Sequence, residues 1–232
     1  DSGSTDGTLE IATRNNCHIY HISRDKFSFG RSLNMGCEAA GGDILVITSG
    51  HCVPTDEHWL QRLCQPILDN QVQYTYGRQI GASESHFSEC QIFSKYYPEE
   101  VNHLKDNFFC NNANSAILRS AWAEYSFDEE ITGLEDMDLA KRLVNDGGRV
   151  HYVPESTVIH YHNETWPQVK RRFEREAIAL QKIMPQVHVS LLDTLRYIFS
   201  SILNDWVCAW REKIWNVKAV EIIYYRWNQY FG

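Results

Sequence analysis

The chain has 232 residues, of which 43% are hydrophobic and 22% are charged. Such a composition is ordinary for a globular protein with one sizeable core, and it excludes a disordered or fibrous chain. The formal net charge of −8 is uneven: residues 1–164 carry 12 Lys and Arg against 24 Asp and Glu, and residues 165–232 carry 10 against 6. The acidic first part argues against nucleic acid as a partner, whereas the basic, aromatic-rich last part suits an anionic surface.

The seven cysteines form no close Cys-x-x-Cys pair. Their odd number and irregular spacing indicate reduced thiols, as in a cytoplasmic protein. No signal peptide is visible, but the sequence begins at Asp1 in what reads as a strand-to-helix turn. We therefore expect that a first strand precedes this sequence.

The first half of the chain alternates between predicted strands and helices. A small polar loop over residues 1–7 leads into a helix, an arrangement that α/β proteins use to bind nucleotides. Beyond it we expect strands over residues 18–22, 43–49 and 72–81 and helices over residues 32–40, 56–68 and 87–96. The continuous apolar run of residues 43–49 is typical of a strand buried in a parallel sheet.

The second half continues the alternation and then becomes helical. After an insertion-like region over residues 82–109, we expect a strand over 115–118, helices around Trp122 and over 134–144, and strands over 150–153 and 157–162. Periodic apolar residues predict helices from residue 166 onward. The order of elements predicts an α/β fold, with a three-layer α/β/α domain and a mostly parallel sheet over residues 1–164 and a helical extension over residues 165–232.

One acidic pair stands at the start of a predicted helix. Thr132 and Gly133 read as the turn before it, so Glu135 and Asp136 fall in its first turn. Backbone N–H groups and the helix dipole favour carboxylates there, and an ionised carboxylate can accept a proton. The pair is therefore a candidate general base; the alternative is that it only caps the helix.

Three histidines are candidate metal ligands. In the strand over residues 157–162, His160 and His162 lie on the same face because side chains alternate along a strand. His51 follows the strand over residues 43–49, at the carboxyl end where open α/β sheets bind ligands. Imidazoles grouped in this way can bind a divalent metal ion; the alternative is that they are bonded to backbone groups.

Asparagine is concentrated in one short segment, at Asn111, Asn112 and Asn114. These residues can serve as turn residues or as hydrogen-bonding groups for a substrate. Both interpretations stay open, and the second places Asn112 and Asn114 on the acceptor side of a site.

The C-terminal extension carries apolar and aromatic residues at intervals of three and four, as an amphipathic helix does. They include Leu195, Ile198, Phe199, Ile202, Trp206, Trp210, Ile214, Val217 and Ile222. No uninterrupted apolar run reaches the about 18 residues that a membrane span needs. The extension can lie on a membrane surface, with Trp at the interface, or it can pack against the first domain or a second subunit.

Several motifs, taken in order, resemble those of one known family. They are DSGSTDGT, FSFGRSLNMGCEAAGGDILV, NNANSAILR, GLEDMDLAKR and VIHYHNE. Over about residues 1–180 the chain resembles family 2 of the glycosyltransferases, which are nucleotide-sugar enzymes of the GT-A fold. The resemblance implies an inverting transferase, in which a hydroxyl of a glycan or lipid-linked acceptor attacks the anomeric carbon of a nucleoside-diphosphate sugar. Synthesis of a surface polysaccharide or exopolysaccharide would be its setting.

The same resemblance assigns roles to individual residues. Asp136 corresponds to the family's catalytic base, and Glu135 is its neighbour. Asp1 corresponds to the first acidic residue of the family, which contacts the nucleotide base. The full set implied for the nucleotide sugar is Asp1, Ser2, Ser4, Arg31, Asn34 and Arg78.

The chain departs from the family's pattern at the metal site. Where the family has Asp-x-Asp, this chain has Ser-Gly-His, and His51 stands in place of the metal-binding Asp. We expect a divalent cation, Mn²⁺ or Mg²⁺, held by His51 with His160 or His162, and imidazole ligands favour Mn²⁺ of the two. The alternative is metal-free stabilisation of the leaving group by Arg31, Arg78 or protonated His51.

Two other functions remain open on the sequence. A catalytically inactive glycan-binding scaffold would have lost its activity together with the Asp-x-Asp motif. A metallohydrolase would use the three histidines and Asp136 to act on a substrate with water alone. In each case we expect a cytoplasmic protein, which can associate with the inner face of the membrane or form a homodimer through its C-terminal helices.

Overall fold

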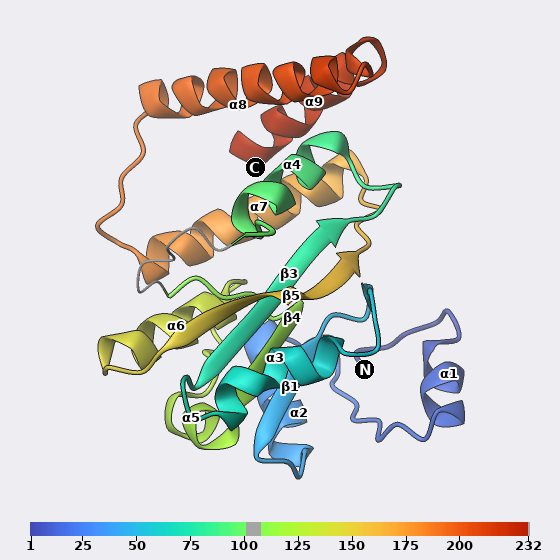
Figure 1. The fold of residues 1–232 in the computed structure, drawn as a ribbon, viewed down its shortest axis with the longest axis vertical. Helices are drawn as coiled ribbons and strands as arrows, with labels where there is room; N and C mark the ends of the chain where they lie inside the picture. Colours follow the sequence, from blue (N-terminus) through green and yellow to red (C-terminus); the bar gives the residue numbers. More distant parts are fainter. Residues whose placement is uncertain (101–107, 232) are drawn as a thin grey trace.

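The computed structural model describes residues 1–100 and 108–231, and their centre is one five-stranded sheet (Figure 1). The strand order is β1-β4-β3-β5-β2. The strands are β1 (Ile44–Thr48), β2 (Cys52–Pro54), β3 (Tyr74–Gly81), β4 (Asn114–Leu118) and β5 (Val150–His160). β5 is one long strand in place of the two that were predicted, and its register against β3 jumps between Val153 and Thr157.

Helices occupy the remaining regular structure of the described chain. They are α1 (Thr8–Arg14), α2 (Phe29–Ala39), α3 (Trp59–Leu68), α4 (Phe87–Tyr96), α5 (Arg119–Tyr125), α6 (Glu135–Asn145), α7 (Trp166–Ile183), α8 (Leu191–Arg211) and α9 (Trp215–Tyr230). The helix predicted within the insertion-like region over residues 82–109 is confirmed as α4. The part of that region over residues 101–107 lies outside the described residues.

Strand directions differ from the prediction. β3 and β5 run parallel, whereas the pairs β1–β4, β3–β4 and β2–β5 are antiparallel. The expectation of a mostly parallel sheet is therefore wrong for the described strands. An apolar run predicts that a strand is buried but not the direction of its neighbours. β1 also lies at an edge of this sheet, where its Val46 is 39% exposed.

Helices cover both faces of the sheet, which confirms the three-layer arrangement. On one face Ala116 of β4 packs with Leu63 and Ile67 of α3. The next residue of the strand, Ile117, belongs to the larger core cluster, which includes Leu139 of α6. Alternation along β4 thus places one helix layer on each side of the sheet.

Residues 18–22, which were predicted as a strand, form no assigned strand. Their backbone bonds to Asp1: the N-terminal amine of Asp1 donates to the Tyr20 carbonyl over 2.6 Å, and Ile22 N–H donates to the Asp1 carbonyl over 2.9 Å. Two hydrogen bonds to a single residue do not make a ladder, so the apolar alternation there is not sufficient for a strand.

The C-terminal helices gather at one end of the molecule, toward which β3 and β5 point (Figure 1). α9 packs against both α7 and α8. Phe87 of α4, Ala209 of α8 and Ile222 of α9 form a small buried cluster. The extension is thus packed onto the first domain through α4. Within the described ranges, no helix combines the length and the apolar character that a membrane crossing needs.

The register jump of β5 depends on a glycine in β3. A methyl group at Gly77 would overlap the Asn114 side chain and the Ser156 carbonyl. We expect Gly77→Ala to lower the free energy of unfolding by about 1–3 kcal/mol, the usual cost of overpacking. Gly36→Ala is the control, because nothing lies within 4 Å of its added methyl group, and alanine in a helix is favoured over glycine by about 1 kcal/mol. Urea unfolding of both variants measures the difference, and an equal stability of the two would contradict the packing argument.

Candidate active site

Three histidines from two strand ends meet at one point. β5 ends at His160, and its antiparallel pairing with β2 brings Cys52 opposite His160. Just before β2, the His51 carbonyl accepts a hydrogen bond from Tyr161 N–H over 2.9 Å. As a result, one ring nitrogen from each of His51, His160 and His162 lies within 4.8 Å of the others. The structure therefore brings together the three predicted metal ligands.

A chain of hydrogen bonds fixes the tautomer of His160. The Asn111 side-chain oxygen accepts from Ala113 N–H over 3.0 Å and from the Gln79 amide nitrogen over 2.9 Å. The Gln79 amide oxygen is then left to face His160 Nδ1 at 2.7 Å. Because that oxygen can only accept, Nδ1 carries the proton and Nε2 carries a lone pair.

The free nitrogen of His160 is buried and points into the histidine cluster. The residue is 6% exposed, and its Nε2 finds no hydrogen-bond partner within the described part of the chain. Burial, together with the neighbouring charges of His162 and His51, lowers the pKa of His160 to about 2. The imidazole is therefore neutral at any working pH, which is the form that binds a metal ion.

The other two histidines also have polar neighbours at their ring nitrogens. His162 Nδ1 lies 2.6 Å from Glu89 Oε1, and a carboxylate oxygen can only accept from it. His51 lies against Ser49, whose hydroxyl is 3.1 Å from Nδ1 and 3.2 Å from Nε2, so this contact does not select one of the two ring nitrogens. Burial, followed by the charge of His162, lowers the pKa of His51. Three imidazoles with available nitrogens fit a divalent ion of borderline softness, such as Mn²⁺ or Zn²⁺, better than Mg²⁺, which prefers oxygen ligands.

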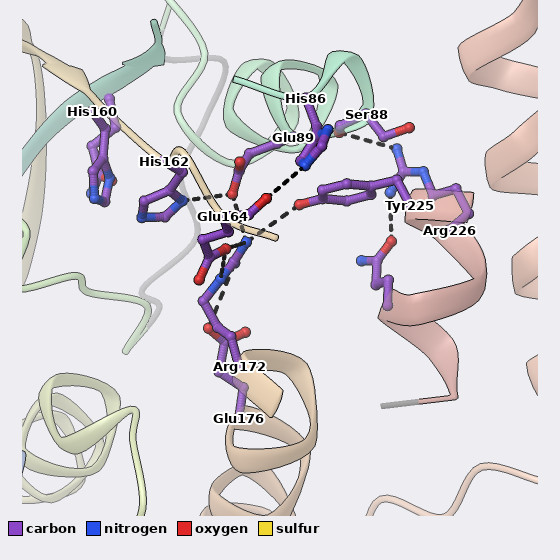
Figure 2. A network of polar contacts seen from close by, with 12 residues as sticks. His86, Ser88, Glu89, His160, His162, Glu164, Arg172, Glu176, Tyr225 and Arg226 are labelled. Atoms are coloured by element: carbon purple, nitrogen blue, oxygen red, sulfur yellow. Dashed lines mark hydrogen bonds and ion pairs between the residues drawn. The ribbon is translucent and has the colours of Figure 1, made fainter. Parts of the chain in front are cut away.

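A second group of possible ligands is already engaged in ion pairs. Glu89, His162 and Glu164 also lie close enough to share an ion. However, Arg172 of α7 bonds to Glu89 over 2.6 Å and to Glu164 over 2.8 Å (Figure 2). The guanidinium therefore occupies the position of the cation in this group, and the three histidines are the better metal site.

The acidic pair at the start of α6 is buried. Leu134, just before it, adopts left-handed backbone angles, which turn the chain so that Glu135 and Asp136 enter the first helical turn. The Asp136 carboxylate accepts from Asn112 N–H over 2.7 Å and from Met137 N–H over 2.8 Å. These bonds hold its two oxygens in a fixed orientation.

The environment of Asp136 makes it a weaker acid than usual. Burial and then the charge of Glu135 raise the pKa of Asp136 from 3.8 to about 7, against the effect of its N–H donors. Burial also raises the pKa of Glu135. Asp136 thus contributes stability that is complete below about pH 4 and is lost as pH rises through about 7. A carboxyl group with this pKa is suited to general base catalysis near neutral pH.

Asn111 and Asn112 connect the acidic pair to the histidines. Asn112 N–H holds Asp136, and the adjacent Asn111 side chain begins the chain that ends at His160. Asn112 Nδ2 is buried with no partner among residues 1–100 and 108–231. An unsatisfied donor next to the candidate base is a feature of a substrate site, because burying it otherwise costs free energy.

Asn114 does not fit the role on the acceptor side that was considered for it. Its side chain is 0% exposed. The amide accepts from Trp59 Nε1 over 2.8 Å and donates to the Ser156 carbonyl over 2.8 Å. Asn114 therefore ties α3 and β5 to β4, and a dissolved acceptor has no access to it in this conformation.

The N-terminal loop borders a pocket of about 420 Å³. Asp1, Ser2 and Ser4 line it, with Tyr20 and Phe27 among the other residues. The Asp1 carboxylate accepts from Gly3 N–H over 2.8 Å and from the Ser4 hydroxyl over 2.5 Å, so it also shapes its own loop. The structure thus places these three predicted donor contacts together, beside aromatic rings on which a nucleotide base can stack.

Arg31, Asn34 and Arg78 make other contacts in this conformation. Arg31 Nε donates to Glu129 over 2.7 Å, and Asn34 Nδ2 donates to the Phe127 carbonyl over 2.9 Å. These bonds fasten α2 to residues 127–129. Arg78 forms a 3.4 Å ion pair with Glu99, and its Nε is buried without a partner in the described chain.

Four residues of the site were not singled out from the sequence. Gln79 and Glu89 orient two histidines, Arg172 pairs with Glu89, and Glu176 lies near Asp136. Burial is the main cause that raises the pKa of Glu176, and the charges of Asp136 and Glu164 add to it. The available signals were a glutamine within a mostly buried strand and a glutamate on the buried face of a helix, because polar groups there need partners.

The described residues thus form a three-layer α/β domain with a buried acidic pair and a cluster of three imidazoles. Residues 1–125 match the family described as Glycosyl transferase family 2. This match covers more than half of the chain, and the chain belongs to that family.

Two curated relatives are both named as rhamnosyltransferases. The chain is 27% identical to the O-antigen chain rhamnosyltransferase WbaN of Salmonella anatum over 184 residues. The aligned region covers 75% of this chain and 58% of the relative. It is 26% identical to the O-antigen chain rhamnosyltransferase RfbN of Salmonella typhimurium over 178 residues, and this aligned region covers 71% of this chain and 56% of the relative. The chain thus spans less than two thirds of the length of either relative.

Solved structures confirm the predicted fold. A mannosyltransferase from Pyrobaculum calidifontis in complex with GDP-Man and Mn²⁺ is similar with a TM-score of 0.62 and 13% identity, over 99% of this chain and 76% of that one. Glucosyl-3-phosphoglycerate synthase from Mycobacterium tuberculosis, in complex with Mn²⁺, UDP-glucose and phosphoglyceric acid, has a TM-score of 0.56 and 18% identity, over 80% of this chain and 66% of that one. At such identities the likeness establishes the fold alone, which is of the GT-A type.

The histidine cluster predicts a measurable response to metal. At a Mn²⁺ concentration about 100 times its dissociation constant, we expect the melting temperature to rise by about 5–10 °C, because the ion binds only the folded chain. His51→Ala should remove most of this rise, since it deletes the exposed ligand without opening the core. His188→Ala, an exposed histidine of the loop before α8, is the control. Thermal unfolding with and without Mn²⁺ measures the effect, and an unchanged rise in the His51 variant would exclude His51 as a ligand.

Proposed function

We propose that the chain is the catalytic part of an inverting glycosyltransferase. It transfers a sugar from a nucleoside-diphosphate sugar to a hydroxyl group of a glycan or lipid-linked acceptor, in the synthesis of a surface polysaccharide such as O-antigen. Family membership and the rhamnosyltransferase relatives support the reaction class. The observation that carries the proposal is the Asn111–Asn112 link, because it joins a candidate base to a candidate site for the leaving group.

On the acceptor side, Asp136 takes the proton. Its pKa of about 7 lets it be ionised at neutral pH and still accept a proton as the acceptor oxygen attacks the anomeric carbon. The new bond forms as the bond to the diphosphate breaks, which inverts the configuration at that carbon. Asn112 Nδ2 is the group that we assign to orienting the acceptor, since it is a buried donor without a partner in the described chain.

On the donor side, the loop of Asp1, Ser2 and Ser4 holds the nucleoside in the adjoining pocket. His51, His160 and His162 would hold a divalent ion, which supplies positive charge to the leaving diphosphate. Arg31 and Arg78 are the cationic side chains that we expect to reach the donor if they exchange their present carboxylate partners. The two relatives make a nucleotide-activated rhamnose the first donor to test.

Two rival functions make different use of the same groups. A scaffold without activity gains nothing from burying Asp136 beside Glu135, because this arrangement destabilises the fold at neutral pH. A metallohydrolase would use the histidine cluster to activate water and would release free sugar without an acceptor. Donor binding without turnover would support the scaffold, and sugar release into water alone would support the hydrolase.

The proposal is tested first at Asp136. Asp136→Asn should lower sugar transfer by about 10²–10⁴-fold, the usual contribution of a general base. Donor affinity, measured by calorimetry with a panel of nucleotide sugars, should stay close to that of the wild type. NMR of the product at the anomeric carbon should show the inverted configuration. Transfer at the wild-type rate by the variant would remove Asp136 from the mechanism.

The pH dependence of transfer gives a second test of the base. Transfer should increase with pH and level off above about 7, because Asp136 must be deprotonated to act. Glu135→Gln should move this rising part of the pH profile to lower pH, since it removes a neighbouring charge that raises the pKa of Asp136. Asp138→Asn is the matched control, because it changes a carboxylate of the same helix that pairs with Arg142. If the pH profile of the Glu135 variant rises over the same pH range as that of the wild type, the electrostatic coupling between Glu135 and Asp136 is contradicted.

The exposed apolar side chains of the extension also fit this function. One row on α9 consists of Val217, Val220, Tyr224 and Trp227, and Phe231, just after the helix, continues it. Its intervals of three and four place it along one side of the helix, and exposed Arg211 and Lys213 lie shortly before the helix in the sequence. We propose that this row contacts the inner face of the membrane, where a lipid-linked acceptor is presented.

Liposome flotation measures this contact. The variant Tyr224→Ser/Trp227→Ser should lose at least about 10-fold of its binding to vesicles that contain anionic lipid, because apolar area drives the insertion. Leu60→Ser/Leu68→Ser removes two exposed leucines of α3 and is the control. A different result would assign the row to a second copy of the chain. In that case the wild type does not bind vesicles but sediments as a dimer, and the Tyr224→Ser/Trp227→Ser variant sediments as a monomer.

A further inference from the structure

Glu89 is a buried carboxylate between the histidine cluster and the C-terminal helices. It belongs to α4 and is 1% exposed. Its Oε1 accepts from His162 Nδ1 over 2.6 Å and from Arg172 Nη2 over 2.6 Å (Figure 2). Its other oxygen has no partner in the parts of the chain that the structure describes. One oxygen thus joins a candidate metal ligand to α7.

Arg172 is held from several sides. Its Nε donates to Glu164 Oε2 over 2.8 Å, and its Nη2 lies 3.5 Å from the Tyr225 hydroxyl of α9 (Figure 2). It also lies 3.9 Å from Glu176, one turn further along α7. These contacts restrict the guanidinium to one position, and that position fixes the bonded oxygen of Glu89.

The C-terminal helices also fix the start of α4. Glu221 of α9 accepts a hydrogen bond from Phe87 N–H, the first residue of α4, over 2.8 Å. Trp166, the first residue of α7, stacks on His86 with ring centroids 4.3 Å apart. A carboxylate at a helix N-terminus satisfies N–H groups that otherwise have no partner in the helix. The position of α4, and with it that of Glu89, therefore depends on residues beyond 164.

We propose that Glu89 is the positioning residue of His162 and that Arg172 acts on the metal site through Glu89. Glu89 holds the His162 ring so that Nε2 faces His51 and His160. Residues 165–232 are then part of the metal site even though no metal ligand lies in them. The inference rests on the proposed function only in that it assigns a divalent ion to the three histidines.

The contacts favour positioning over simple structural support. A buried ion pair is weak support for a fold, since desolvating both charges offsets much of their attraction. A carboxylate bonded to the far nitrogen of a metal-binding histidine orients the ring, and removal of such a partner usually lowers metal affinity about 10–100-fold. Glu89 has the geometry of such a partner, because it faces Nδ1 and leaves Nε2 free.

The test measures metal binding by the full chain without any turnover. Glu89→Gln keeps the size of the side chain and an oxygen that can accept from His162, but it removes the charge. We expect it to weaken Mn²⁺ binding about 10–100-fold in calorimetric or EPR titrations. The visible absorption spectrum of bound Co²⁺ should change as well, because it reports the geometry of the ligands. Glu84→Gln, an exposed neighbour in the sequence, is the control and should match the wild type.

Arg172 is tested by a cycle of variants. Arg172→Met should weaken Mn²⁺ binding, whereas Arg171→Met, an exposed arginine beside it, should not. If Arg172 acts through Glu89, the double variant Glu89→Gln/Arg172→Met should bind Mn²⁺ no more weakly than Glu89→Gln alone. The double variant also avoids leaving Glu89 charged and unpaired, so it stays folded if Arg172→Met alone does not. Circular dichroism checks the fold of each variant.

The outcomes separate this inference from the proposed function. If Glu89→Gln is folded and has the Mn²⁺ affinity and the Co²⁺ spectrum of the wild type, the positioning role of Glu89 is overturned, even if the wild type transfers sugar. Additive losses in the double variant would overturn the route from Arg172 through Glu89. A wild type that transfers sugar but binds neither ion would overturn the metal site and the inference together and leave the transferase assignment standing.

Discussion

The hydrogen bond between Gln79 and His160 determines what the site can do. It exists because β3 and β5 run parallel and in register at their carboxyl ends, where Gly81 pairs with His160. β5 is also paired with β2 on its other side, and this second pairing brings His51 to the same place. One strand therefore organises the site from both edges. Backbone pairing and one amide thus orient the His160 imidazole and leave its other nitrogen available.

The site separates two kinds of polar environment. Around the histidines, carboxylates are paired with Arg172, and the imidazoles present free nitrogens. Around Asp136, the carboxyl groups of Glu135 and Asp136 lie side by side and are buried, so their pKa values rise. The first environment suits an anionic leaving group bound through a cation, and the second suits proton transfer. α7 spans both, because Arg172 pairs with Glu89, and the charge of Asp136 raises the pKa of Glu176 one turn later.

Short-range patterns predicted more of this protein than long-range ones could. Local periodicity predicted the bounds of α4 and the first turn of α6. The rule that ligands gather at strand ends predicted the grouping of His51 with His160 and His162. The strand directions did not follow, because pairing partners are set by distant parts of the chain. The roles of Gln79, Glu89 and Arg172 could not be predicted for the same reason. Each is an ordinary residue in its own element and becomes functional only through a partner that lies 32 to 83 residues away.

The contacts between α4 and the last helices bear on how such enzymes can be recombined. Glu221 bonds to the first residue of α4, Trp166 stacks on His86, and Arg172 pairs with Glu89. A chimaera that took residues 165–232 from one parent and α4 from another would join unmatched halves of all three contacts. The natural unit of exchange is therefore discontinuous in sequence and must carry α4 along with the C-terminal helices.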